Sequence, residues 1–150
     1  MNQEFADYLE SIGIKAGSLL DQIKSIYEFY LEMCPDEIAD IFVTDYIDSE
    51  GKREYENLCF FSDKYTMEAK GFAMGKDDFD IAPIKGRVKY YEIQKQDYDF
   101  KEATEKSRLT LHFSLDTGVH GEFKASKENC DALRDIILKH VKPNLKDSFV

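Results

Sequence analysis

The side chains best suited to metal chemistry in this chain are His112, His120 and Glu122. Imidazole nitrogens and carboxylate oxygens are acceptable zinc ligands when they converge. The alternating pattern of the surrounding residues predicts a hairpin whose outer face carries all three side chains. A solvated polar sheet face gives the same pattern and is the simpler interpretation. The three residues are therefore candidate ligands only, and no metal is expected.

Other clusters lack the spacing that catalysis or cofactor binding requires. Asp77, Asp78 and Asp80 are crowded into one short stretch, without the ligand spacing and central glycine of a calcium loop. The stretch from Gly71 to Gly75 does not match a phosphate-binding glycine loop, and the sequence contains no Gly-x-Ser-x-Gly elbow. We therefore expect no cofactor and no enzymatic activity.

Acidic charge is concentrated in the first 60 residues. They contain 14 aspartates and glutamates against 4 lysines and arginines, and the remaining residues contain 16 of each, so the net charge of −10 belongs to the first part. Nucleic acids and anionic membranes attract basic surfaces, so we expect no binding to nucleic acid or membrane lipid. A protein partner with a basic surface, or self-association, is expected instead. The candidate partner-binding residues are Asp45, Asp48, Glu50, Glu54 and Glu56.

Three basic side chains offer an alternative, anion-binding site. Lys85, Arg87 and Lys89 stand at alternate positions of a predicted strand, so they would share one face and could meet a phosphate together. Lys52 and Arg53 are the other basic pair that a lipid headgroup could use, but carboxylates surround them in the sequence and would oppose binding.

A hairpin is the clearest element of the last third of the chain. Apolar and polar residues alternate from Leu109 to Leu115, which predicts a strand with one buried face. A three-residue loop ending at Gly118 places Phe123 opposite Leu111, so that every apolar side chain lies on the same face. A loop one residue shorter would mix the faces.

An amphipathic helix is predicted directly after this hairpin. Apolar residues recur at helical spacing from Cys130 to Val141, and Ser126 is the expected N-cap. The helix is expected to end near Val141 or Lys142, because Pro143 disfavours helical backbone in the residue before it. Such a helix normally covers the sheet that precedes it.

The N-terminal part predicts two helices, a short one before Gly13 and a longer one from an N-cap at Ser18 to about Met33. The longer helix carries a broad apolar stripe that must be covered, and docking on the sheet is expected ahead of a partner or oligomer interface. We expect residues 1–34 to form a helical extension packed on a domain of residues 35–150.

Alternating patterns from Ala39 onward predict about seven strands and an α+β fold. The turn around Asp48 joins the first two strands, whose register stays open because both parities leave apolar residues on each face. A strand extension from Tyr98 to Phe100 is also considered.

Three segments then occur in a suggestive order, FFSDKYTMEAKGF, DFDIAPIKGRVKYYEI and LTLHFSLDTGVHGEF, followed by the C-terminal helix. Together they resemble the pleckstrin-homology superfold, particularly its bacterial PH-like and GRAM-like branches, over roughly residues 38–142. The resemblance implies a bent antiparallel barrel of about seven strands with a C-terminal capping helix. It also implies a binding or assembly module, and lipid-binding members carry basic residues around the first hairpin, where this chain is mainly acidic.

The expected location is cytoplasmic. No apolar run approaches the ~20 residues that span a bilayer, and the first residues lack the basic-then-apolar order of a signal peptide. Cys34, Cys59 and Cys130 are isolated in the sequence, which fits reduced thiols.

The expected function is a non-enzymatic module that recognises a protein partner, or another copy of itself, through an acidic surface. An immunity-type or inhibitor-type antagonist of a basic effector is the alternative, since charge complementarity could neutralise such a target. A phosphoinositide or membrane recruitment module comes third.

Overall fold

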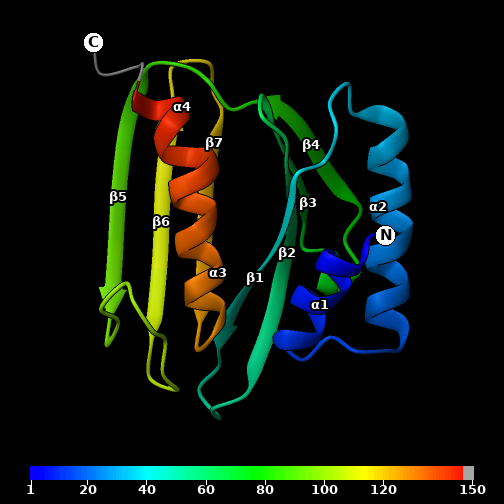
Figure 1. Cartoon of the computed structure of the whole chain (residues 1–150), viewed down its shortest axis with the longest axis vertical. Helices are drawn as coiled ribbons and strands as arrows, with labels where there is room; N and C mark the ends of the chain where they lie inside the picture. Colours follow the sequence, from blue (N-terminus) through cyan, green and yellow to red (C-terminus); the bar gives the residue numbers. More distant parts are fainter. Residues whose placement is uncertain (147–150) are drawn as a thin grey trace.

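The structure is a computed structural model that describes residues 1–146, and it has two antiparallel sheets with helices around them (Figure 1). The first sheet has the order β1-β2-β3-β4 and the second the order β5-β6-β7. The strands are β1 (Asp40–Ile47), β2 (Arg53–Phe61), β3 (Tyr65–Lys70), β4 (Asp78–Pro83), β5 (Val88–Gln96), β6 (Arg108–Leu115) and β7 (His120–Ser126). The helices are α1 (Gln3–Ser11), α2 (Ser18–Met33), the 3-10 turn η1 (Phe72–Met74), α3 (Asn129–Ile136), the π-helical η2 (Ile137–Val141) and α4 (Lys142–Lys146).

The α+β class and the number of strands are confirmed, whereas closure of the strands into a barrel is not. Within residues 1–146 no backbone ladder joins the two sheets. The segment from Tyr98 to Phe100 is not a strand either; Tyr98 is buried and its hydroxyl donates to Asp131 Oδ1 at 2.7 Å.

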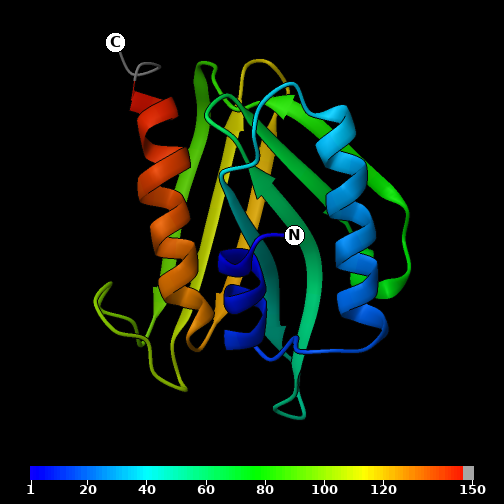
Figure 2. The ribbon, with the colours of Figure 1, turned by 45° about the vertical axis from the view of Figure 1, so that its right-hand side comes forward.

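Helices α1 and α2 lie over one face of the first sheet (Figure 2). The apolar stripe of α2 buries Ile23 and Tyr27 among strand residues such as Phe60, with the rings of Tyr27 and Phe60 5.7 Å apart. Ser18 is the first residue of α2 rather than its cap; Gly17 holds the cap position with a φ of 95°. The helices therefore supply part of the hydrophobic core.

The first hairpin contains a β-bulge. The bulge explains why a regular alternation of inward-facing and outward-facing residues cannot place all the apolar residues on one face. Val43 lies opposite Leu58, but Asp45 lies opposite Tyr55, so one more residue is used on β2 than on β1 between these pairs. A bulge reverses the facing of the side chains on one side of it. Apolar residues on both sides of the bulge can then face the same core.

The predicted register of the last hairpin is confirmed. Leu109 pairs with Ala125 and Leu111 with Phe123, and all four side chains are buried. Gly118 ends the loop with a φ of 90°, a left-handed conformation that glycine adopts without strain.

The C-terminal helix differs from the prediction at both ends. Ser126 belongs to β7 and does not cap the helix, because its hydroxyl donates to Asp45 instead. At the other end the helical path passes through the π-helical turn η2 and continues into α4, with Pro143 in the first turn. Pro143 has no N–H to donate to the preceding turn, and the π-helical turn η2 lies directly before it.

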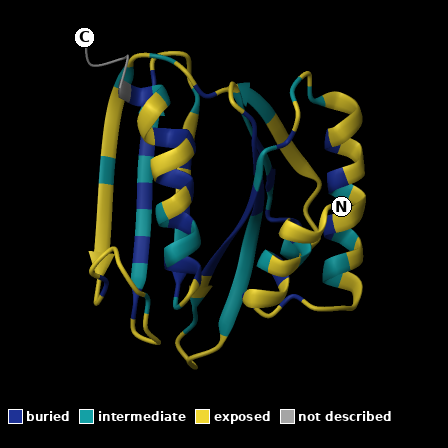
Figure 3. Ribbon diagram, in the orientation of Figure 1, coloured by how far each residue is buried: buried dark blue, intermediate teal, exposed yellow. Residues whose placement is uncertain are grey.

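A second part of the core lies between the two sheets and under α3, and buried residues line all three (Figure 3). Phe61 and Phe123 make an edge-to-face contact at 5.8 Å. The ring of His140 stacks on Phe61 at 5.3 Å, and its Nε2 is hydrogen-bonded to the carboxylate of Asp40.

The three cysteines are free thiols at different depths. Cys59 lies between the sheets, and Cys130 lies in the first turn of α3 on its buried face. Burial raises the pKa of both thiols, that of Cys130 to about 12. Cys34, which follows α2, is half-buried.

In the part of the chain described, no helix is long and apolar enough to cross a membrane.

Candidate functional site

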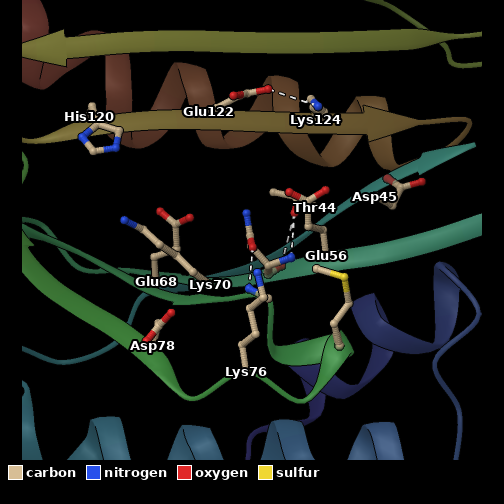
Figure 4. Close-up of a pocket in the computed structure, with 13 residues that line it drawn as sticks. Thr44, Asp45, Glu56, Glu68, Lys70, Lys76, Asp78, His120, Glu122 and Lys124 are labelled. Carbon is tan, nitrogen blue, oxygen red and sulfur yellow. Dashed lines mark hydrogen bonds and ion pairs between the residues drawn. The ribbon is translucent and has the colours of Figure 1, made fainter.

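A polar cleft opens between β7 and the part of the first sheet that the second sheet leaves uncovered (Figure 4). Its volume is about 370 Å³. On the β7 side it is lined by His120, Glu122 and Lys124, and on the β3 side by Glu68 and Lys70. The cleft exists because β7 and β1 converge near Asp45 and diverge toward His120, as Figure 4 shows.

Glu68 is the most perturbed carboxylate of the cleft. Its side chain points from β3 toward β7 (Figure 4), is half-buried, and makes no hydrogen bond or ion pair with any residue from 1 to 146. Burial raises the pKa of Glu68; Lys70 opposes this shift, and Asp80 and Glu56 add to it. Asp80 lies directly opposite Glu68 on β4, a like-charge arrangement that destabilises a sheet.

Several neighbouring charges are neutralised within the cleft. Lys70 pairs with Asp80, with 3.0 Å from Nζ to Oδ2. Lys124 pairs with Glu122, with 3.1 Å from Nζ to Oε1. The other ionisable side chains that line the cleft, outside these pairs and the Asp45 network, are mainly acidic. They are Glu56, Glu68, Asp78, Lys76 and His120.

The closed end of the cleft is sealed by Asp45, which is 1% exposed. Its carboxylate accepts hydrogen bonds from the Ser126 backbone N–H (3.0 Å) and from Asn129 Nδ2 (2.7 Å). It also pairs with Arg53 Nε at 2.9 Å. Arg53 in turn donates to the Ser126 carbonyl (2.8 Å) and to Glu128 (2.5 Å). One carboxylate thus joins the first sheet to the second sheet and to the start of α3.

Tyr8 connects α1 to the same network. Its hydroxyl donates to Asn129 Oδ1 at 2.7 Å and accepts the Val43 backbone N–H at 3.0 Å. Asn129 also donates from Nδ2 to the Val43 carbonyl at 2.8 Å. Burial raises the pKa of Tyr8. The N-terminal helix therefore reaches into the junction between the two sheets.

The structure separates the five carboxylates predicted to bind a partner. Asp45 is 1% exposed, and its carboxylate already binds Arg53, Ser126 and Asn129. Asp48 caps its own turn by accepting two backbone N–H groups at 2.9 Å each, and Glu54 lies 3.6 Å from the neighbouring lysine. Glu50 is exposed at the hairpin tip, and Glu56 lines the cleft together with the buried Asp45.

The basic residues predicted as an anion site do not share a strand face. Lys85 and Arg87 precede β5, and a bulge between Val88 and Tyr90 breaks the alternation at Lys89. Arg53, the other basic candidate, is committed to the Asp45 network.

The histidines and carboxylate proposed as metal candidates lie on one sheet face, as the register requires. His112 is opposite Glu122, and His120 is opposite Ser114. Among residues 1–146 no group of three His, Cys, Asp or Glu side chains could hold a metal ion. Asp78 and Asp80 belong to β4 and not to a turn.

Sequence reasoning missed Glu68 because its environment depends on long-range pairing. The alternation of β3 places Glu68 on the face opposite the α2-covered core, and that much is visible in the sequence. Its position beside Asp80 requires the β3–β4 register, and its burial requires β7. Neither follows from local pattern.

Comparisons of the chain with protein-family models, with curated proteins and with solved structures found no match.

Proposed function

We propose that this protein is a non-enzymatic, PH-like binding module of the cytoplasm whose cleft receives a cationic side chain of a protein partner. The fold assignment is supported by the seven antiparallel strands, in sheets of four and three, that are followed by a C-terminal helix. The free thiols fit a reducing compartment. The binding function is supported mainly by Glu68.

Glu68 carries the proposal because it is an ionisable group that is partly desolvated and has no hydrogen-bond or ion-pair partner among residues 1–146. A carboxylate loses hydration when it is buried and regains stability from an opposite charge at hydrogen-bonding distance. The excess of carboxylates over cations at the cleft favours a lysine or arginine of a partner as that charge. Perturbed carboxylates in clefts are common at functional sites.

The basic residues of the first hairpin favour a protein over a lipid as the partner. A membrane surface would have to attract Lys52 and Arg53, yet Arg53 is held by Asp45 and Glu128, and Lys52 lies beside Glu54. Each basic residue near an anionic membrane contributes only about 1 kcal/mol, so little attraction is left. We expect no sedimentation with anionic vesicles at physiological salt.

The experiment is a titration with a blocked glycine-serine peptide that carries one central arginine, followed through backbone amide shifts. The matched control peptide has citrulline, which is neutral and similar in shape. We expect the arginine peptide to shift the amides of Glu56, Glu68 and Lys70 and to leave those of Glu50 unchanged. Equal shifts with the citrulline peptide would refute a charge-based site.

Two variants test the role of the carboxylate. Glu68→Gln should weaken binding of the arginine peptide roughly tenfold to a hundredfold, because a hydrogen bond to a charged group contributes about 1.5–3 kcal/mol. Glu50→Gln, an equally conservative change at the exposed hairpin tip, should leave the affinity unchanged. Equal affinity of the two variants would exclude Glu68 as the recognition group.

The pH dependence of binding follows from the raised pKa of Glu68. A bound cation favours the ionised carboxylate, so binding lowers this pKa and releases a proton. Affinity should therefore fall as the pH decreases through the pKa of Glu68 in the free protein. Glu68→Gln should show no such decrease in the same interval.

A further inference from the structure

Strand β5 is the least protected edge of the two sheets. It has nine residues and lies at the outer side of the molecule, and no helix or strand of residues 1–146 lies beside its free edge (Figure 1). The other outer edge, β4, has six residues, ends in Pro83 and carries two aspartates. Natural proteins usually shorten, charge or cover such edges because an exposed strand invites pairing with another chain.

The backbone N–H and C=O groups of successive β5 residues point alternately toward β6 and toward the free edge of the sheet. Leu115 donates its N–H to the Val119 carbonyl at 2.8 Å, so odd-numbered residues of β6 point their N–H and C=O groups toward β7. Even-numbered residues of β6 therefore point toward β5, and they lie opposite the even-numbered residues of β5. The β5 residues whose backbone groups face outward are Tyr91, Ile93 and Lys95.

The outward edge also has exposed apolar side chains. Ile93 is 37% exposed, and Tyr91 lies beside it on the same sheet face. Together with Leu138 and Ile137 they line a groove of about 280 Å³ between β5 and the C-terminal helix. Large apolar residues gathered at an unpaired strand indicate a surface that is covered in the functional state.

We propose that a second copy of this chain pairs with β5, edge to edge and antiparallel, about a two-fold axis at Ile93. This register places Tyr91 opposite Lys95 of the second copy and Glu92 opposite Gln94, each pair occurring twice. A lysine against an aromatic ring and an amide against a carboxylate are favourable cross-strand pairs. Residues with outward backbone groups then face one another, as a hydrogen-bonded ladder requires.

Neighbouring registers are less favourable because they bring like charges together or shorten the ladder. An axis at Glu92 sets that carboxylate opposite itself and Lys89 opposite Lys95. An axis at Tyr91 sets Arg87 opposite Lys95. An axis at Gln94 leaves only residues 92–96 paired within the strand. The sequence of β5 is therefore self-complementary in this register, since it opposes no like charges, and this favours a second copy as the occupant.

The pairing closes after two copies. The same strand is used on both sides of the axis, so the contact is isologous and cannot extend into a fibre. Two three-stranded sheets become one six-stranded sheet, and the two apolar grooves lie on the same face at either side of the axis. The polar cleft lies beside β7, at the other edge of the sheet, and stays open.

Sedimentation equilibrium of the full chain tests this proposal. We expect a reversible dimer that Ile93→Lys weakens at least tenfold, because two introduced cations would meet at the axis. Tyr46→Lys is the matched control, since Tyr46 is 39% exposed on a strand of the other sheet. A protein that remains monomeric up to about 1 mM, or a dimer that Ile93→Lys leaves intact, overturns the proposal.

A charge exchange tests the register. Tyr91→Lys alone places a new cation opposite Lys95 and should weaken the dimer at least tenfold. Adding Lys95→Glu in the same chain converts each of these contacts into an opposite-charge pair and should restore dimerisation. Failure of the double variant to recover, while its circular dichroism spectrum matches the wild type, contradicts the register. Glu68→Gln should not affect the dimer.

Discussion

Asp45→Asn removes one negative charge from the junction between the sheets without changing the size of the side chain. Asp45 is buried and accepts hydrogen bonds from Ser126 and Asn129 while it pairs with Arg53. An asparagine would turn its amide N–H₂ toward one of these donors, and two donors cannot satisfy each other. The substitution therefore leaves a buried donor without an acceptor and removes one of the two carboxylates that pair with Arg53.

The expected loss is about 3 kcal/mol of unfolding free energy. Removing one partner of a buried ion pair costs about 3–5 kcal/mol, and we take the lower end because Glu128 still pairs with Arg53 at 2.5 Å. A typical domain has about 5–15 kcal/mol in total, so the loss is a large fraction of the stability. With a urea m-value of about 1–3 kcal/mol per molar, the unfolding midpoint should fall by roughly 1–3 M.

The assay is equilibrium unfolding in urea, followed by far-ultraviolet circular dichroism because the chain has no tryptophan. Glu50→Gln is the control, and at an exposed turn it should change stability by less than about 0.5 kcal/mol. A loss below about 1 kcal/mol for Asp45→Asn would refute the view that this carboxylate joins the sheets. A double-mutant cycle with Arg53→Met should show coupling between the two residues.

Three further substitutions test separate parts of the fold by the same unfolding assay. Gly118→Val should cost about 1–3 kcal/mol from its left-handed φ alone, because no atom of residues 1–146 outside its two chain neighbours lies within 4 Å of an added Cβ; an unchanged midpoint would contradict the loop conformation. Leu133→Ala should cost about 2–5 kcal/mol, while Leu138→Ala, at a site 54% exposed, should cost far less, and equal losses would mean that α3 is not docked. Tyr30→Phe should stabilise the protein by about 1 kcal/mol or more, since the buried Tyr30 hydroxyl has no hydrogen-bond partner within the described residues; destabilisation would indicate that the hydroxyl is satisfied.

The parts of the fold that could be predicted are those with strong local periodicity. Alternation from Leu109 to Leu115 together with Gly118 determined the last hairpin down to its register. The first hairpin could not be resolved, because its bulge beside Asp45 changes the parity partway along the strands. A pattern with a period of two has no means of indicating such an irregularity.

The helix termini and the site depended on contacts that are remote in the chain. Ser126 has the composition of an N-cap, yet Asp45, far away in sequence, binds its hydroxyl and keeps it in β7. Asp45 was grouped with the other carboxylates of the first hairpin as a partner-binding residue, and its burial depends on Arg53, Ser126 and Asn129, two of which are remote in the sequence. Glu68 became a candidate once β4 and β7 were placed around it.

The three free thiols give the molecule a set of internal reporters of local unfolding. Thiolates rather than thiols react with alkylating reagents, so burial protects Cys59 and Cys130 both by excluding the reagent and by raising the pKa. Cys34 should react first, from the native state. Cys130 should become reactive when α3 detaches, and Cys59 only when the sheets separate. The rates of labelling would thus rank the opening free energies of the helix and of the sheet junction within one unmodified chain.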